Sequence, residues 1–259
     1  AYVTDVDITP DGKYVLANDG WYSTSVVDVA SRTKVSVSSG TGAAVAVGDG
    51  GTVLAADSSS GLVRRLVLGE HGTLHPAGVS FTSAGATSVV LAPDGRTGVA
   101  IGAVVESFTV WDMKPIGTPT NLGTAVVSAV FSLQGDRLFL RTSANVSAWS
   151  YDRGTGRLGA TPLFTVGLGG ASRVWGVDQL DVSPDGAKLY VTDNTGMRVI
   201  DAWRGSLLQV LFNPLHRYLG LDVAASSVPS RSQPVPVARG AYIDGEWDDI
   251  LHSAGAPEC

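Results

Sequence analysis

Cysteine is almost missing from this sequence of 259 residues, because its one cysteine, Cys259, is also the last residue. A disulfide within the chain and a metal cluster held by cysteines are therefore excluded. Charge is sparse as well: 16% of the residues are charged, and the 18 basic side chains are scattered. Since nucleic-acid binding needs positive charge gathered against phosphates, and the formal net charge is −6, no nucleic-acid partner is expected.

Long apolar runs are missing too. None approaches the roughly 20 residues that a membrane-spanning helix needs, so no membrane span is expected. The first residues lack the basic, apolar and small-residue order of a signal peptide. The sequence begins at Ala1 rather than Met, which we interpret as a weak indication of export. We expect an extracellular or periplasmic location, with the cytoplasm as the alternative.

The motifs of familiar catalytic and cofactor sites are also absent. No histidine stands in a His-Glu-x-x-His frame, and there is no Gly-x-Ser-x-Gly elbow. The glycine-rich segment "SSGTGAAVAVGDGG" leads into a predicted strand, whereas a nucleotide-binding loop leads into a helix. The "DVD" of residues 5–7 is too short for a calcium loop. We therefore predict no metal and no cofactor.

The sequence does contain a repeated hairpin, in keeping with its 32 glycines and 12 prolines. Its copies are "VDITPDGKYVLAND", "AAVAVGDGGTVLAAD", "SVVLAPDGRTGVAIG", "SAVFSLQGDRLFLRT" and "QLDVSPDGAKLYVTD". Their turn glycines are Gly12, Gly50, Gly95, Gly135 and Gly186, spaced by 38 to 51 residues. A period of about 40 residues made of strands alone indicates the blades of a propeller.

Each copy has a local physical logic. The strands alternate apolar and polar residues, Pro presets φ in the turn, Asp accepts a hydrogen bond from the following backbone, and Gly takes the positive φ. In most copies a third strand closes on an aspartate, and a fourth strand follows; these aspartates are Asp28, Asp112, Asp152 and Asp201. Because they recur from unit to unit, we interpret them as turn residues. The prediction is an all-β chain, a β-propeller of four-stranded antiparallel blades.

The last copy, "VSPDGAKLYVTDN" followed by "MRVID", resembles the repeat of the YVTN family of β-propellers. The resemblance covers roughly residues 4–212. It implies the propeller fold. Relatives include surface-layer proteins, lactonase-like enzymes and propeller subunits of redox enzymes, so the resemblance implies no single activity.

The end of the chain decides the number of blades. Residues 213–259 are long enough for one more blade of about 40 residues, so we predict a single propeller domain over residues 1–259 with six blades, the last one degenerate. The alternative is five blades and a closing tail. Residues 1–3 are candidates for completing the last blade, because an open propeller would leave strand edges exposed.

The loops that enter the innermost strands, and those that join second to third strands, gather on one face of a propeller. Ligand-binding candidates there are Asp19, Trp21, Glu106, Arg141, Trp175 and Asp193. The long connection "VGLGGASRVWGVDQ" interrupts the repeat, and insertions of this kind mark a working face. The candidate catalytic residues are Arg173, Asp178 and His216. For Trp21 and Trp175, packing between blades is the alternative.

Two functions follow from these observations. The first is a binding or scaffold protein that recognises a partner protein, a glycan or a small ligand through the loop face. The alternative is a small-molecule enzyme, either a lactonase-like hydrolase or a cyclase or isomerase, with acid–base residues at the mouth of the central channel. The missing catalytic motifs favour the first, and the inserted loop keeps the second open.

Overall fold

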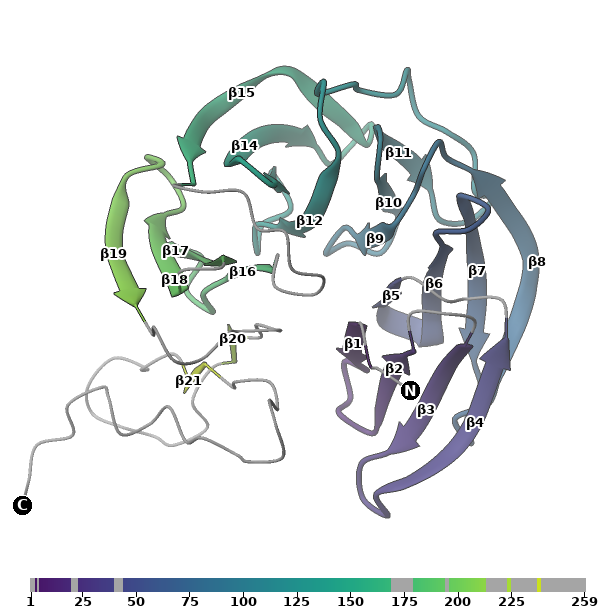
Figure 1. Cartoon of the computed structure of the whole chain (residues 1–259). Coiled ribbons are helices and arrows are strands. Elements are labelled where there is room, and N and C mark those ends of the chain that lie inside the picture. Colours follow the sequence, from purple (N-terminus) through teal and green to yellow (C-terminus); the bar gives the residue numbers. More distant parts are fainter. Residues whose placement is uncertain are drawn as a thin grey trace, which may run out of the picture. The chain divides into compact units, whose positions relative to one another are not determined.

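The computed structural model describes residues 3, 5–19, 23–39, 44–168, 179–193, 196–212, 223–224 and 237–238. The regular secondary structure of these residues consists almost entirely of β-strands (Figure 1). One short 3-10 helix, η1 (Asp49–Gly51), interrupts them. No helix in these residues is long or apolar enough to cross a membrane. The all-β prediction is confirmed.

Most strands belong to four-stranded antiparallel sheets whose strands are ordered as in the chain. The first sheet has β1 (Asp5–Ile8), β2 (Tyr14–Asn18), β3 (Ser23–Asp28) and β4 (Thr33–Ser39). The second has β5 (Ala44–Val47), β6 (Thr52–Asp57), β7 (Leu62–Leu68) and β8 (Leu74–Thr82). The fourth has β12 (Val126–Phe131), β13 (Arg137–Thr142), β14 (Asn145–Asp152) and β15 (Arg157–Gly167), and the fifth has β16 (Leu180–Val182), β17 (Lys188–Asp193), β18 (Gly196–Asp201) and β19 (Leu207–Phe212). A two-stranded sheet pairs β20 (Val223–Ala224) with β21 (Val237–Ala238).

The third sheet departs from the predicted pattern, because it has three strands: β9 (Ser88–Leu91), β10 (Thr97–Ile101) and β11 (Val105–Thr109). The chain after β11 runs beside it through isolated bridges at Pro115 and Thr120. Prolines have no amide hydrogen to donate to a ladder, and this stretch holds Pro115 and Pro119. It therefore pairs with β11 only in part.

The predicted hairpin turns are confirmed in each copy. The turn glycines Gly12, Gly50, Gly95, Gly135 and Gly186 all have φ between 64° and 71°. The aspartates of these turns accept backbone hydrogen bonds, as in Lys13 N to Asp11 Oδ1 at 3.1 Å. The aspartates that follow the third strands do the same; Trp203 N and Arg204 N each donate to Asp201 Oδ1 at 2.8 Å. Their interpretation as turn residues holds.

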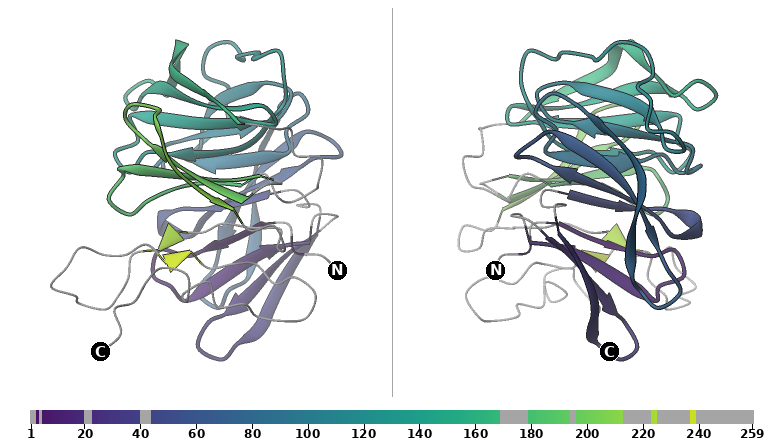
Figure 2. Two further views of the ribbon diagram at one scale, coloured as in Figure 1. Left: turned by 60° about the vertical axis from the view of Figure 1, so that its left-hand side comes forward. Right: turned by 90° about the vertical axis from the view of Figure 1, so that its right-hand side faces the viewer.

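The chain forms two compact units, residues 1–127 with 134–138 and 150–160, and residues 128–133 with 139–149 and 161–259. In the first unit, neighbouring sheets pack face to face. Leu16 and Val26 of the first sheet lie against Val45, Val53 and Ala55 of the second. The inner strands β1 and β5 lie side by side, and so do the outer strands β4 and β8 (Figure 1). Figure 2 shows the same ribbon from two further sides. This packing places the edge of β5 against β1, where the candidate site lies.

Candidate functional site

The alternation of β1 places two carboxylates, Asp5 and Asp7, on one side of the strand. This side faces the edge of β5, which is the first strand of its sheet. Val45 N donates to Asp5 Oδ2 at 2.8 Å, and Val47 N donates to Asp7 Oδ2 at 2.7 Å. The second oxygens accept from the next amides of their own strand, Val6 N at 3.1 Å and Ile8 N at 2.8 Å. The side chains of Asp5 and Asp7 in the first sheet therefore accept hydrogen bonds from the backbone amides at the edge of the second sheet.

The environment of Asp5 perturbs its protonation. Burial raises the pKa of its carboxyl group from 3.8 to about 7, because the charged form loses solvation. The hydrogen bond from Val45 N acts in the opposite direction and lowers this pKa, and the nearby charge of Asp7 raises it further. A carboxyl group with a pKa near 7 exchanges its proton at neutral pH, which is the property of a general acid or base.

Asp5 departs from the repeat, and Asp7 departs from it in two of the sheets. In strand register, Asp5 corresponds to Ala44 and Ser88, and Asp7 corresponds to Ala46 and Val90. Asp7 also corresponds to Asp181 in the fifth sheet. In the sequence, residues 5–7 resemble only part of a calcium loop, and they are too short for one. The sequence pattern therefore misses this site. The signal that could have found it is Asp5, a carboxylate where the second and third copies have the small residues Ala44 and Ser88.

The ligand-binding candidates that the structure describes lie in three different settings. Asp19 follows β2 and holds the connection to β3, since its two carboxylate oxygens accept from Ser23 N at 2.9 Å and from Ser23 Oγ at 2.6 Å. Glu106 lies on β11, opposite Ala100, and is partly exposed. Arg141 lies on β13 with none of its surface exposed, so its predicted place in a loop is wrong, because the strand extends further than the sequence pattern indicated. Its role in ligand binding stays a prediction.

The remaining candidates lie at the edge of the described residues or outside them. Asp193 is the last residue of β17 by its backbone, which pairs with Gly196. Trp21, Arg173, Trp175, Asp178 and His216 lie outside the described residues. Within the described residues, no cluster of three or more histidine, cysteine or acidic side chains could hold a metal ion.

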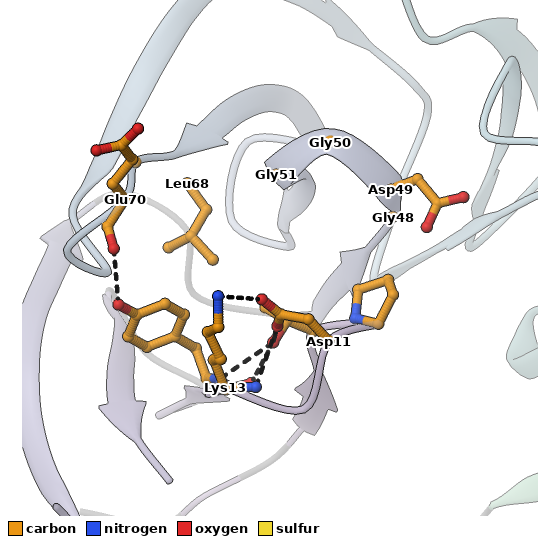
Figure 3. A pocket seen from close by; sticks show the side chains of 12 residues that line it. Asp11, Lys13, Gly48, Asp49, Gly50, Gly51, Leu68 and Glu70 are labelled. Carbon is orange, nitrogen blue, oxygen red and sulfur yellow. Dashed lines mark hydrogen bonds and ion pairs between the residues drawn. The ribbon is translucent and has the colours of Figure 1, made fainter. Parts of the chain in front are cut away.

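A pocket of about 380 Å³ lies at the opposite end of β1 and β5 from Asp5, between the hairpin turns of the first two sheets (Figure 3). Lys13 Nζ lies 3.2 Å from Asp11 Oδ2 in an exposed ion pair. The hydroxyl of Tyr14 donates to the backbone oxygen of Glu70 at 2.9 Å and joins the two hairpins. These contacts hold turns together, and none pairs a nucleophile with a base. Asp5 and Asp7 therefore remain the candidate site.

Comparison with known proteins gives a likeness of fold. No protein-family profile matches the sequence, and no curated protein matches it, so membership of the YVTN family stays a prediction. Solved structures do match. One is a functionally unknown protein from Desulfotomaculum acetoxidans, 18% identical, with a TM-score of 0.72 over 80% of this chain and 71% of that one.

Two further matches carry an activity in their names. One is assigned as a 6-phosphogluconolactonase, from Bacteroides uniformis; it is 21% identical, with a TM-score of 0.68 over 91% of this chain and 78% of that one. The other is the periplasmic gluconolactonase of Pseudomonas aeruginosa, 17% identical, with a TM-score of 0.65 over 81% of this chain and 69% of that one. The chain shares the propeller-like, all-β fold of these structures.

Proposed function

We propose that this protein is an enzyme that hydrolyses a sugar lactone. The observation that carries the proposal is the likeness of its fold to two structures named as lactonases. It supports the enzyme hypothesis more than the binding scaffold that the sequence favoured. A binding role for Trp21 and Trp175 stays a prediction, as do the catalytic roles of Arg173, Asp178 and His216.

Asp5 supplies the acid–base chemistry in this proposal. Its carboxylate takes a proton from a water molecule while the water oxygen forms a bond to the lactone carbonyl carbon. The ring C–O bond then breaks, and Asp5 returns the proton to the leaving ring oxygen. A pKa of about 7 suits both directions of transfer. The amides of Val45 and Val47 hold the two carboxylates in place.

The first prediction tests this activity with the full chain. Hydrolysis of glucono-1,5-lactone and its 6-phosphate, followed by acid release, is expected to exceed the spontaneous rate. Asp5→Asn keeps the shape of the side chain and removes the exchangeable proton, so kcat is expected to fall about 100-fold or more.

The control for this experiment is Asp49→Asn, because Asp49 is an exposed carboxylate on η1, and its kcat is expected to match that of the wild type. A wild-type rate no faster than buffer with either lactone contradicts the enzyme proposal. Unchanged kcat in Asp5→Asn contradicts the role of Asp5 alone.

We also propose the finer architecture, a six-bladed propeller whose last blade comes from residues 213–259. Support comes from the repeat itself. Val6 of β1 is 55% exposed, whereas Val45, at the same register position of the second sheet, is buried beneath the first sheet. A sixth sheet would cover Val6 in the same way. The periplasmic origin of one structural neighbour supports an extracellular or periplasmic location.

A further inference from the structure

The turn after β11 displays Trp111 with 79% of its surface exposed. Isolated apolar residues on a surface are common, but three features show that this indole is held in place rather than merely left outside. They concern the backbone of the turn, the residue that stacks on the ring, and the strand that carries that residue.

The buried side chain of Met113 anchors the turn. Met113 has a left-handed φ of 55°, a backbone conformation that is uncommon for residues other than glycine and asparagine. Its side chain is 2% exposed and belongs to the core between the second and third sheets. The hydroxyl of Thr109 donates to the Asp112 carboxylate, and Lys114 N donates to Thr109 Oγ1 at 3.2 Å. Burial of Met113 therefore directs Trp111 outward.

The indole is held on one face by Arg65, from β7 of the second sheet. The guanidinium carbon lies 5.5 Å from the centre of the ring, and Nη1 donates to the Trp111 backbone oxygen at 3.3 Å. Arg65 stands where the pairing of β7 with β8 shifts register, between Arg64 and Leu66. Such bulges re-aim side chains. Since 79% of the surface of Trp111 is exposed, most of the ring is open to solvent.

We propose that Trp111 is a binding platform for a pyranose ring of a carbohydrate. The C–H bonds on one face of a pyranose carry partial positive charge and match the negative face of the indole. Asp112 and Lys114 follow Trp111 in the same turn, form an ion pair of 2.9 Å, and offer an acceptor and donors to sugar hydroxyls. Because the indole is held before binding, little conformational entropy is lost on contact.

Charged neighbours argue against a protein partner. The cores of protein interfaces are depleted in Asp and Lys, whereas Asp112 and Lys114 follow Trp111 in this turn, and the other apolar side chain of the turn, Met113, is buried. The proposed platform is separate from Asp5 and does not depend on lactone hydrolysis.

Calorimetric titration of the full chain with cellopentaose, xylopentaose and chitopentaose tests the proposal. The wild type is expected to bind at least one of them. Trp111→Ala is expected to weaken binding about tenfold or more, and Trp111→Phe less. Arg65→Met removes the stacked cation and keeps an unbranched side chain, so a smaller loss is expected.

The matched control is Trp203→Ala. Trp203 occupies the same position in the turn after β18 that Trp111 occupies in the turn after β11. The residues just before them, Ala202 and Val110, show this equivalence, because the backbone N of each donates a 2.9 Å hydrogen bond to a backbone oxygen in the first hairpin of its own sheet. This variant is expected to bind as the wild type does. No binding of any of the three sugars, or equal affinity in Trp111→Ala, overturns the proposal. A concentration-dependent dimer that Trp111→Ala abolishes also overturns it, because the turn would then be an interface between copies.

Discussion

Asp5 shows how one residue can couple the stability of the fold to pH. Its pKa is raised from 3.8 to about 7 in the folded chain, so between these values the folded state holds a proton that the unfolded state releases. The resulting stabilisation is complete below pH 4 and is lost as pH rises through 7. The slope is about 1.4 kcal/mol for each pH unit in this range.

The second prediction follows at this scale. Asn carries no charge, but its NH2 group cannot accept either of the amide hydrogen bonds that the two oxygens of Asp5 accept, so at pH 5 Asp5→Asn is expected to be less stable than the wild type by about 1 kcal/mol. This difference is expected to shrink or reverse as the pH rises to 8, because the wild type then buries a charge and the variant does not. Urea unfolding across this pH range measures the difference.

Asp11→Asn is the control, since the hydroxyl of Thr9 lowers the pKa of Asp11. A lowered pKa has the opposite sign: its stabilisation is present above the unfolded pKa and is lost only as pH falls. Parallel pH profiles for Asp5→Asn and the wild type would mean that Asp5 titrates as it does in water.

The hairpin turn is the element on which the fold is built, and its glycines meet two different demands. Gly12 has a φ of 70° and open space where a Cβ would stand. Gly61 has a φ of 67°, and a Cβ there would come within 2.5 Å of the Ser83 backbone oxygen. The first glycine is required by backbone conformation alone, and the second by conformation and by close approach of two chain segments.

The third prediction compares these two positions. Gly12→Ala is expected to lower the free energy of unfolding by about 1–2 kcal/mol, the cost of the left-handed conformation. Gly61→Ala is expected to cost more, because a backbone oxygen cannot move aside as the end of a flexible side chain can. Urea unfolding of both variants measures the difference, and equal costs would contradict the packing argument.

At the scale of the whole molecule, the first sheet exposes apolar side chains that no described part of the chain covers. Val6 and Ile8 of β1 are 55% and 50% exposed. Exposed apolar strands invite association with other chains. The six-blade proposal gives this face a cover made from residues 213–259.

The fourth prediction tests that cover through Val6→Lys. A substitution on an open surface changes the free energy of unfolding by less than about 0.5 kcal/mol, whereas a charge placed under a packed sheet costs several times more. We expect the larger cost in the full chain and the smaller one in a chain that ends at residue 212. Val29→Lys, in an exposed turn of the same sheet, serves as the control. A small cost in the full chain would contradict the six-blade proposal.

The sequence by itself determined the strands, the hairpin turns and the structural role of the turn aspartates. The reason is that these features are local: alternation of period two and the chemistry of Pro, Asp and Gly act within a few residues. The missing fourth strand of the third sheet had a local cause in Pro115 and Pro119 as well, although the repeat obscured it.

Tertiary structure alone decided the surroundings of Asp5 and Trp111, on which the two proposals depend. Asp5 acquires its pKa from burial and from Val45, which is 40 positions away in the chain. Trp111 is held by Arg65, which is 46 positions away. Solvation and stacking depend on which segments meet in space, so a repeat pattern predicts where strands lie but not what surrounds the side chains that depart from it.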